Sequence, residues 1–530
     1  MKKNKHEQTG LLSRMDSFFG KHEKTFLLVS LALGTVMSIL MFDCKVSLSG
    51  DDCDYIINAQ NFIKHFAYPG GRGALYPIVI APFLAGGLNL ILIKSLSALF
   101  IVASIWLMYA SFRGKIPASV LMPALLITSL CPYIFFYACH TYSEPFFMLT
   151  QALFIYLFSK YFWNDSRTAP LQLKTDWRKF LLIGLCFLAM GLTRTIGYAV
   201  LGAVIAYFSF RRQWKNLLYS VTASGAVFIV FSLIKKAVWP ASGAAYNIYN
   251  YLARNFYNHE QGMEDLPGFI NRLIVNSNVY LSKFLYQFMG LRTTAVTLDS
   301  KPLLTVITYA LFLVCIIAVY KKSKPLFFTG LYAGIMNIAS FILLQTVWEQ
   351  DRLIMIYYPF MLLFLLGGIY YLLKNRRFKK LTAIYPLILT ALLVGTGIHM
   401  KAKVGENLPV LQQNLAGNDL YGLTSDWENF IKMSRWANDN LAKDAVIVSR
   451  KPSISYVYTG RNFAGIYNVP LVAISDIAGQ SREEQTQNIF LAIELKSENL
   501  YTVLLPFTEY AFFSKDNNTF SINGKKIASA

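Results

Sequence analysis

The segment TFLLVSLALGTVMSILMF (Thr25–Phe42) decides the fold class of this chain. An uncharged apolar run of about 18 residues is long enough to cross the hydrocarbon core of a bilayer as an α-helix. Its polar lead-in is long, and no small-x-small cleavage pattern follows it. We therefore expect a retained membrane anchor and not a cleaved signal peptide.

The composition extends this prediction to most of the chain. Of the 530 residues, 55% are hydrophobic and only 15% are charged, whereas a soluble chain of this length would be richer in charge. The net charge of +21 comes from short basic clusters between apolar runs. This pattern is typical of membrane orientation signals, so we expect a lipid bilayer as the environment and no nucleic-acid partner.

The chain is predicted to be an α-helical polytopic membrane protein with about eleven transmembrane helices. Their approximate bounds are 25–42, 88–112, 117–138, 143–163, 180–193, 196–210, 216–238, 303–320, 326–344, 353–373 and 381–398. Together they make up a predicted transmembrane domain over residues 25–400.

Basic residues indicate how these helices are oriented. The N-terminal tail (1–24) is basic, and so is every second loop after it; these loops contain Arg113, Arg178, Arg211, Lys321 and Arg377. Because basic loops stay in the cytoplasm, the tail is predicted to be cytoplasmic. An odd number of spans then places residues 401–530 outside the cytoplasm, at the plasma (inner) membrane of a bacterial cell.

The first outward loop, residues 43–73, contains the acidic cluster Gly50-Asp51-Asp52-Cys53-Asp54-Tyr55. Neighbouring carboxylates at a membrane surface repel one another, so the cluster is expected to have a function. Apolar residues from Tyr55 to Phe66 recur at helical spacing and predict an interfacial helix. A turn-rich stretch, Pro69–Pro77, then leads back into the bilayer.

Two further outward regions are predicted. Residues 239–301 are rich in Tyr and Asn, including Tyr246, Tyr249, Tyr251 and Tyr257, which suits a wet interface or the binding of sugars. Residues 401–530 predict a small extracytoplasmic α/β domain, since a helical pattern at 426–441 is followed by apolar strand-like runs at 445–449 and 501–505. Acceptor recognition and structural capping are equally compatible with this domain.

The order of several short motifs resembles GT-C-fold membrane glycosyltransferases of the protein O-mannosyltransferase and aminoarabinose-transferase type. The matching elements are Asp51-Asp52-Cys53-Asp54-Tyr55, Ala74-Leu75-Tyr76-Pro77, Ser143-Glu144-Pro145, Leu192-Thr193-Arg194, and Asp351-Arg352 before Tyr357-Tyr358-Pro359. The resemblance covers about residues 20–400. Asp52 stands where the family usually has Glu, and Gly73-Ala74 replaces the usual Pro-Pro.

This resemblance implies a polyprenyl- or dolichyl-phosphate sugar donor and transfer with inversion at the anomeric carbon. It implies that Tyr55 and Tyr76 contact the substrate. Asp51, Asp52 and Glu144 would be catalytic, and arginines of the outward loop and helix ends would bind the donor phosphate.

The chemical properties of these residues support the same reaction independently of the resemblance. Neighbouring acids raise the proton affinity of a carboxylate, so we expect Asp51 to be the general base that activates the acceptor hydroxyl. Asp52 would then contact sugar hydroxyls or the acceptor loop, and Glu144 would orient the base or bind sugar. Guanidinium groups can bind a phosphate in a bidentate manner, which suits donor phosphate binding by Arg72, Arg194 and Arg352.

Each assignment has a structural alternative. Asp51 or Asp52 could cap a helix N-terminus in a solvated turn, and Glu144 could stabilise the positive end of its helix beside Pro145. The three arginines could extend toward lipid headgroups. Cys44 and Cys53 share the first outward loop, where either a disulfide or two free thiols would be compatible with the sequence.

No cofactor is required by this mechanism, because arginine alone can neutralise a phosphate leaving group. A divalent cation, Mg²⁺ or Mn²⁺, could bridge Asp51 or Asp52 to the phosphate. No histidine pair has metal-ligand spacing, so no structural metal site is expected.

The sequence therefore predicts an inverting glycosyltransferase, hexosyl or pentosyl, that transfers a sugar from a polyprenyl-phosphate donor. The acceptor would be a protein, lipid A or an envelope glycan at the outer face of the membrane. The alternative function is a multi-span transporter or lipid flippase. The clustering of acids and arginines at one membrane face, and the lack of inverted repeats, favour the enzyme.

Overall fold

The computed structural model describes residues 10–163, 173–240, 251–256, 261–293, 299–443, 446–449, 451–465, 500–504, 511–514, 519–522 and 525–529. The described chain packs as two units. The first unit comprises residues up to Asp43 together with Asn58–Leu411, and the second comprises Cys44–Ile57 together with the chain from Gln412. Residues 43–73, predicted to be the first outward loop, are thus divided between the units, because the residues around the acidic cluster pack with the C-terminal part.

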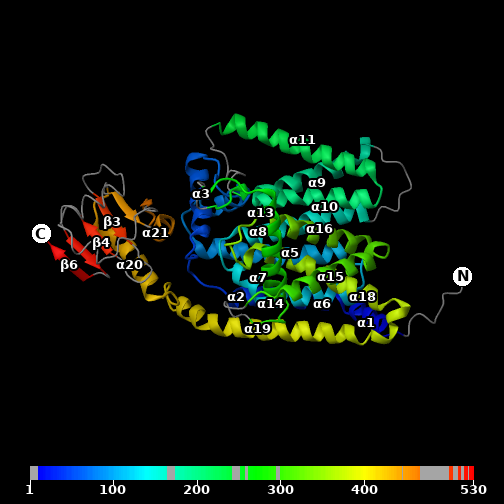
Figure 1. The fold of residues 1–530 in the computed structure, drawn as a ribbon. Helices are drawn as coiled ribbons and strands as arrows, with labels where there is room; N and C mark the ends of the chain where they lie inside the picture. The colour runs from blue at the N-terminus through cyan, green and yellow to red at the C-terminus, as the bar shows by residue number, and fades with distance from the viewer. Residues whose placement is uncertain are drawn as a thin grey trace. The chain divides into compact units, whose positions relative to one another are not determined.

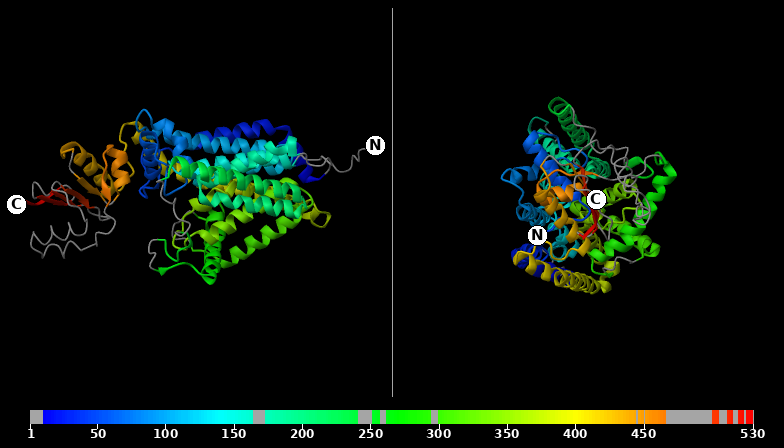
Figure 2. Two further views of the ribbon diagram at one scale, coloured as in Figure 1. Left: turned by 90° about the horizontal axis from the view of Figure 1, so that it is seen from above. Right: turned by 90° about the vertical axis from the view of Figure 1, so that its left-hand side faces the viewer.

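The first unit is a bundle of α-helices, most of which lie alongside one another in Figure 1 and in the turned views of Figure 2. Its α-helices are α1 (Leu11–Lys21), α2 (Glu23–Leu40), α4 (Leu75–Ile80), α5 (Leu90–Phe112), α6 (Ala118–Ser129), α7 (Pro132–Ala138), α8 (Ser143–Phe158), α9 (Leu173–Thr193), α10 (Val200–Phe210), α11 (Trp214–Val238), α13 (Leu266–Val279), α14 (Leu285–Phe288), α15 (Pro302–Tyr320), α16 (Lys324–Leu343), α17 (Arg352–Met355), α18 (Tyr358–Leu373) and α19 (Ile384–Leu415). Helix α3 (Asp51–His65) begins in the second unit and ends in the first, whereas α19 begins in the first unit and its residues from Gln412 belong to the second.

Six described helices are long and apolar enough to cross a membrane: α2, α5, α11, α15, α16 and α19. Helices α6 and α7 together could form a seventh span, bent by 55°. The bend lies at Cys131-Pro132, where the proline ring removes a backbone donor and disfavours a helical conformation in the residue before it. A multi-pass helical membrane fold is therefore confirmed, whereas the count of eleven spans stays a prediction.

Close approach between helices depends on glycine. A Cβ atom added at Gly368 of α18 would overlap Cys315 of α15, and one added at Gly330 of α16 would overlap the ring of Phe364. In an apolar solvent, helices associate by van der Waals packing, so small residues at the contacts allow the backbones to approach. The core of the unit lies where α5, α8, α16 and α18 meet, and α18 is buried along most of its length.

Two segments contain more helix than the sequence indicated. Residues 239–301, expected as an outward loop region, contain α13, a π-helical turn at Tyr280–Phe284 and α14. Of the tyrosines noted there, Tyr251 is described, whereas Tyr246, Tyr249 and Tyr257 lie outside the described residues. Helix α19 continues to Leu415, beyond the predicted end of the last span near Ile398.

The second unit contains α20 (Ser425–Asn440), α21 (Pro452–Thr459) and six strands. The strands are β1 (Val446–Ser449), β2 (Ala464–Gly465), β3 (Leu500–Leu504), β4 (Ala511–Ser514), β5 (Thr519–Ile522) and β6 (Lys525–Ser529). Their order in the sheet is β2-β1-β3-β4-β5-β6. Strand β1 pairs in parallel with β2 and β3, and the remaining pairs are antiparallel.

The predicted helix at 426–441 and the predicted strands at 445–449 and 501–505 each lie within two residues of α20, β1 and β3. Residues 458–459 form the last turn of α21, and Gly460 ends that helix with a positive φ of 73°. The extracytoplasmic location of this unit stays a prediction.

The glycine contacts give a first testable prediction. Gly368→Ala should destabilise the protein by about 1–3 kcal/mol, because the new methyl group would have to displace Cys315. The matched control is Gly225→Ala in α11, where nothing lies within 4 Å of the added Cβ. Thermal unfolding in detergent should show a lower midpoint for the first variant and an equal or higher midpoint for the second. Equal midpoints for both would contradict the packing described here.

Candidate active site

A buried carboxylate and two arginines lie together in the first unit. Glu144 Oε1 lies 2.7 Å from Nη1 of Arg194 and 3.8 Å from Nη1 of Arg352. The Glu144 side chain is 1% exposed, whereas those of Arg194 and Arg352 are 19% and 16% exposed. We call these three residues the arginine–glutamate cluster. It brings together three of the residues that the sequence singled out.

The start of α8 places Glu144 in the cluster. The helix begins at Ser143, and Glu144 lies in its first turn, followed by Pro145. A carboxylate is favourable at the positive end of a helix, and proline is tolerated there because its missing N–H would have no partner within the helix. The favourable position at the helix start does not offset the free-energy cost of burying the Glu144 carboxylate completely. The two guanidinium groups are needed to compensate its charge.

A sharp corner in the chain places Arg194. Helix α9 ends at Thr193, and a 3₁₀ turn, Thr195–Ala199, leads into α10. The N–H of Gly197 donates to the carbonyl of Arg194 at 2.7 Å. A Cβ atom at Gly197 would overlap the carbonyl of Met190, so the corner can close only with glycine at this position. Arg194 also donates to Ser143 Oγ at 3.3 Å, beside Glu144.

Arg352 is held by aromatic and acidic neighbours. Its guanidinium carbon lies 4.9 Å from the ring centroid of Tyr142, a cation–π contact. Asp351 accepts hydrogen bonds from the hydroxyl of Tyr137 at 2.6 Å and from the backbone N–H of Arg352 at 2.7 Å. Burial raises the pKa of the Asp351 carboxyl above its ordinary value, against the opposing effects of these donors.

The loop before α4 contacts the corner that holds Arg194. A Cβ atom added at Gly73 would overlap the carbonyl of Thr193, so the two backbones touch. In the sequence, Arg72 directly precedes Gly73 and Arg194 directly follows Thr193. Arg72 is half-buried. The glycine that replaces the family's usual proline is therefore required by this close approach.

Tyr76, assigned to substrate contact, is completely buried in the first unit. Its ring centroid lies 6.0 Å from that of Phe146, and its hydroxyl lies 3.5 Å from Ser97 Oγ. These contacts pack α4 against α5 and α8. Substrate contact by Tyr76 stays a prediction.

The acidic cluster lies in the second unit, at the start of α3. Asp52 is completely buried, and its two oxygens accept from the backbone N–H groups of Ser47 at 2.7 Å and Cys53 at 3.0 Å. Gly50, with a positive φ of 82°, allows the tight turn that precedes them. Asp52 therefore shapes the turn, whereas the neighbouring Asp51 is half-buried.

The C-terminal part of the second unit contacts the same turn. Ser453 Oγ donates to Asp54 at 2.8 Å, Lys45 Nζ to the carbonyl of Tyr421 at 3.0 Å, and the Val46 N–H to the Tyr458 hydroxyl at 3.3 Å. Tyr55, which was assigned to substrate contact, is buried here. The tail of the chain thus contributes directly to the conformation of the acidic loop.

Cys44 and Cys53, for which the sequence left a disulfide open, are both free thiols. Burial, together with the Asp52 and Asp54 carboxylates, raises the pKa of the Cys53 thiol well above its usual range. This thiol is therefore a poor nucleophile for disulfide exchange. Across the described part of the chain, no group of three or more His, Cys, Asp or Glu side chains is arranged to hold a metal ion.

The sequence matches no protein-family model and no curated protein. The fold, however, is similar to solved structures. The oligosaccharyltransferase AglB from Archaeoglobus fulgidus, in complex with an inhibitory peptide and a dolichol-phosphate, aligns with a TM-score of 0.53 and 12% identity, over 91% of this chain and 70% of AglB. ArnT from Cupriavidus metallidurans, in the apo state, aligns with a TM-score of 0.51 and 12% identity, over 92% of this chain and 94% of ArnT.

Both are membrane glycosyltransferases of the GT-C fold. The resemblance predicted from the sequence is therefore confirmed at the level of the fold. At 12% identity, the likeness does not extend to the substrates of this chain, which are considered below.

Sequence reasoning did not select Tyr137, Tyr142 or Asp351 as site residues, although Tyr142 and Asp351 contact Arg352 and Tyr137 donates to Asp351. Asp351 was quoted only as part of a motif. A signal existed in the stretch Tyr137–Glu144, where polar and aromatic residues interrupt two apolar runs. The pairing of Tyr137 with Asp351, which is 214 positions away, has no counterpart in the local sequence.

The cluster gives a second prediction. Glu144→Gln should destabilise the first unit by about 3 kcal/mol, because removal of one charge from a buried ion pair leaves the other uncompensated. The matched control is Glu406→Gln, whose carboxylate is 64% exposed and pairs with Lys403 on the surface of α19. The control should unfold within about 0.5 kcal/mol of the wild type. If the two variants have the same free energy of unfolding in detergent, the charge of Glu144 does not stabilise the positions of Arg194 and Arg352.

Proposed function

We propose that this protein is an inverting membrane glycosyltransferase that uses a sugar linked to a polyprenyl phosphate. The observation that supports this most directly is the arginine–glutamate cluster in a GT-C fold. One buried carboxylate orients two partly exposed guanidinium groups, one from the corner after α9 and one from the start of α17. Guanidinium groups held in this way are suited to a phosphate, because their donors are oriented before the ligand arrives.

The proposed reaction is a single displacement. The acceptor hydroxyl oxygen attacks the anomeric carbon from the face opposite the lipid phosphate, and Asp51 takes up the hydroxyl proton. The bond between the anomeric carbon and the phosphate oxygen breaks, and the polyprenyl phosphate departs with both bonding electrons. Arg194 and Arg352, and Arg72 in the same role, stabilise the charge that develops on the leaving oxygen.

Asp51 is preferred to Asp52 as the base. Both oxygens of Asp52 accept backbone hydrogen bonds, and the side chain is completely buried, so this carboxylate is already engaged in holding the turn. Asp51, next to it and half-buried, is better suited to exchange a proton with a substrate. Asp52 would then act by fixing the turn. This structural role is preferred here to a direct contact between Asp52 and the sugar.

The proposal includes a bacterial plasma (inner) membrane location, a cytoplasmic N-terminus, about eleven spans and an extracytoplasmic C-terminal α/β domain. The orientation rests on the distribution of basic residues. AglB was solved with dolichol-phosphate and a peptide bound, which makes a lipid-phosphate donor a natural choice for this chain. The acceptor is a protein, lipid A or an envelope glycan, and the sugar is a hexose or a pentose.

The third prediction tests the base. Asp51→Asn should lower the rate of sugar release from polyprenyl-phosphate sugars by about a hundredfold or more, because an amide cannot accept the proton. The assay uses purified protein in detergent with radiolabelled donors and a panel of acceptors. Asp54→Asn is the control, since its amide oxygen can still accept from Ser453; it should retain wild-type turnover.

Undiminished turnover in Asp51→Asn would refute its role as the base. If the wild type releases no sugar from any donor and instead moves a solute or lipid across proteoliposome membranes, the protein is a transporter or flippase.

The fourth prediction tests the phosphate site. Arg352→Lys keeps the charge but loses the planar fork, so the KM for the donor should rise about tenfold. Arg113→Lys, at a side chain that is 54% exposed, is the control.

The turnover of the wild type and of both variants should also be measured with and without EDTA. If arginines alone neutralise the phosphate, chelation leaves wild-type turnover unchanged, whereas lost activity restored by Mg²⁺ or Mn²⁺ would show that a cation shares this role.

A further inference from the structure

Lys94 is a lysine inside a helix that is otherwise suited to a membrane. Helix α5 has a mean hydropathy of 2.2 over its most apolar window, yet the Lys94 side chain is completely buried in it. A charged group in such a place is costly unless a partner compensates it, and it commonly has a function. Nothing in the reaction proposed above uses Lys94.

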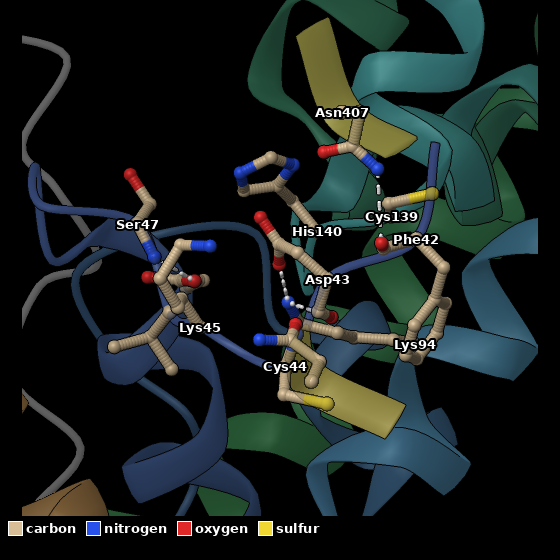
Figure 3. Close-up of polar contacts among 12 residues, drawn as sticks. Phe42, Asp43, Cys44, Lys45, Ser47, Lys94, Cys139, His140 and Asn407 are labelled. Carbon is tan, nitrogen blue, oxygen red and sulfur yellow. Dashed lines mark hydrogen bonds and ion pairs between the residues drawn. The ribbon is translucent and has the colours of Figure 1, made fainter. Parts of the chain in front are cut away.

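Its partner is Asp43, just beyond the end of α2. Lys94 Nζ lies 2.6 Å from Asp43 Oδ1 and 2.9 Å from the backbone carbonyl of Asp43, as Figure 3 shows. The ammonium group thus binds both the side chain and the main chain of one residue. It fixes the direction of the backbone at Asp43 as well as neutralising its charge.

Other residues hold the same end of α2. Asn407 of α19 donates to the carbonyls of Leu40 and Phe42 at 3.0 Å each; Figure 3 shows its contact with Phe42. Cys139 Sγ lies 3.2 Å from the carbonyl of Ser38. The last carbonyls of a helix have no partners within it, so these donors replace the missing bonds. Lys94 also supplies a positive charge at the negative end of the helix dipole.

The place of this contact in the chain indicates its role. Asp43 is the last residue of the first unit before Cys44 begins the second, and Asp51 follows eight positions after Asp43. We propose that Asp43 and Lys94 are a positioning pair for sugar transfer, because they fix where the chain that carries Asp51 leaves the first unit. This inference rests on the glycosyltransferase function proposed above.

An ion pair suits this task better than it suits stability. Replacing a buried ion pair by apolar residues of similar size is often neutral or stabilising, so net stability is not the main property that this pair adds. Apolar contacts are tolerant of small shifts, whereas two hydrogen bonds from one ammonium group to one residue define a direction. Specificity of conformation is therefore the property that the pair adds.

The test compares Lys94→Met and Asp43→Asn with the double variant, which has no buried charge. Asp43→Asn alone should unfold at a lower temperature, because it leaves the ammonium group uncompensated. The double variant should regain most of the wild-type midpoint. Its kcat should remain about ten- to a hundredfold below that of the wild type, with the donor KM unchanged, since misplacement of a base slows the reaction without weakening donor binding.

A second measurement is independent of activity. Cys44 is half-buried and adjacent to Asp43, whereas the other five cysteines are buried. Its labelling by a polar maleimide should be several times faster in the double variant than in the wild type, because the exit of the chain is no longer fixed. Lys403→Met, on the surface of α19, is the control and should change neither kcat nor labelling.

A double variant that is stable, has wild-type kcat and labels at the wild-type rate would overturn the positioning role. If the wild type transfers no sugar, the proposed function fails; unchanged Cys44 labelling would then separately overturn the anchoring of the exit. If the double variant does not fold, Lys94→Arg tests the pair, since it keeps the positive charge but cannot reproduce both bonds of the ammonium group to Asp43. It should lower kcat without changing the donor KM.

Discussion

The buried carboxylate of Glu144 joins three helix ends in the first unit. It lies in the first turn of α8, Arg194 lies just after α9, and Arg352 is the first residue of α17. A carboxylate that is almost inaccessible to solvent can remain ionised only while cations stay beside it. Separation of any of these three elements would therefore expose an unpaired charge to an apolar environment, which ties their positions to one another.

The need to compensate the charge of Glu144 explains why the arginine–glutamate cluster lies where helices are interrupted. Arg194 occupies a corner that only glycine at 197 allows to close, and Gly73 lets the loop before α4 touch the same corner. Irregular backbone at membrane depth is tolerated where protein or water satisfies its polar groups. The interruptions thus place the polar side chains of the arginine–glutamate cluster together, and under the proposed function these side chains bind the donor phosphate.

The acidic loop is shaped by a different part of the chain. Its turn is stabilised by Asp52 from within, and residues of the C-terminal part contact it through Tyr421, Ser453 and Tyr458. The C-terminal part is therefore integral to the conformation of the loop that carries Asp51. Under the proposed function, this gives the tail a role in arranging the base, in addition to any role in acceptor recognition.

The sequence by itself determined the multi-pass membrane class and located the six described helices that are long and apolar enough to cross a bilayer. Runs of apolar residues are sufficient for this, because a bilayer requires a helix wherever about 20 such residues follow one another. The same pattern placed α20, β1 and β3 to within two residues.

Only the tertiary structure decided which of these residues act together. The pairing of Glu144 with Arg194 and Arg352, of Tyr137 with Asp351, and of Lys94 with Asp43 joins positions between 50 and 214 residues apart. The assignment of residues 44–57 to the C-terminal unit is of the same kind. Such contacts depend on how helices pack and where their ends meet, and a linear pattern of apolar residues contains no record of either.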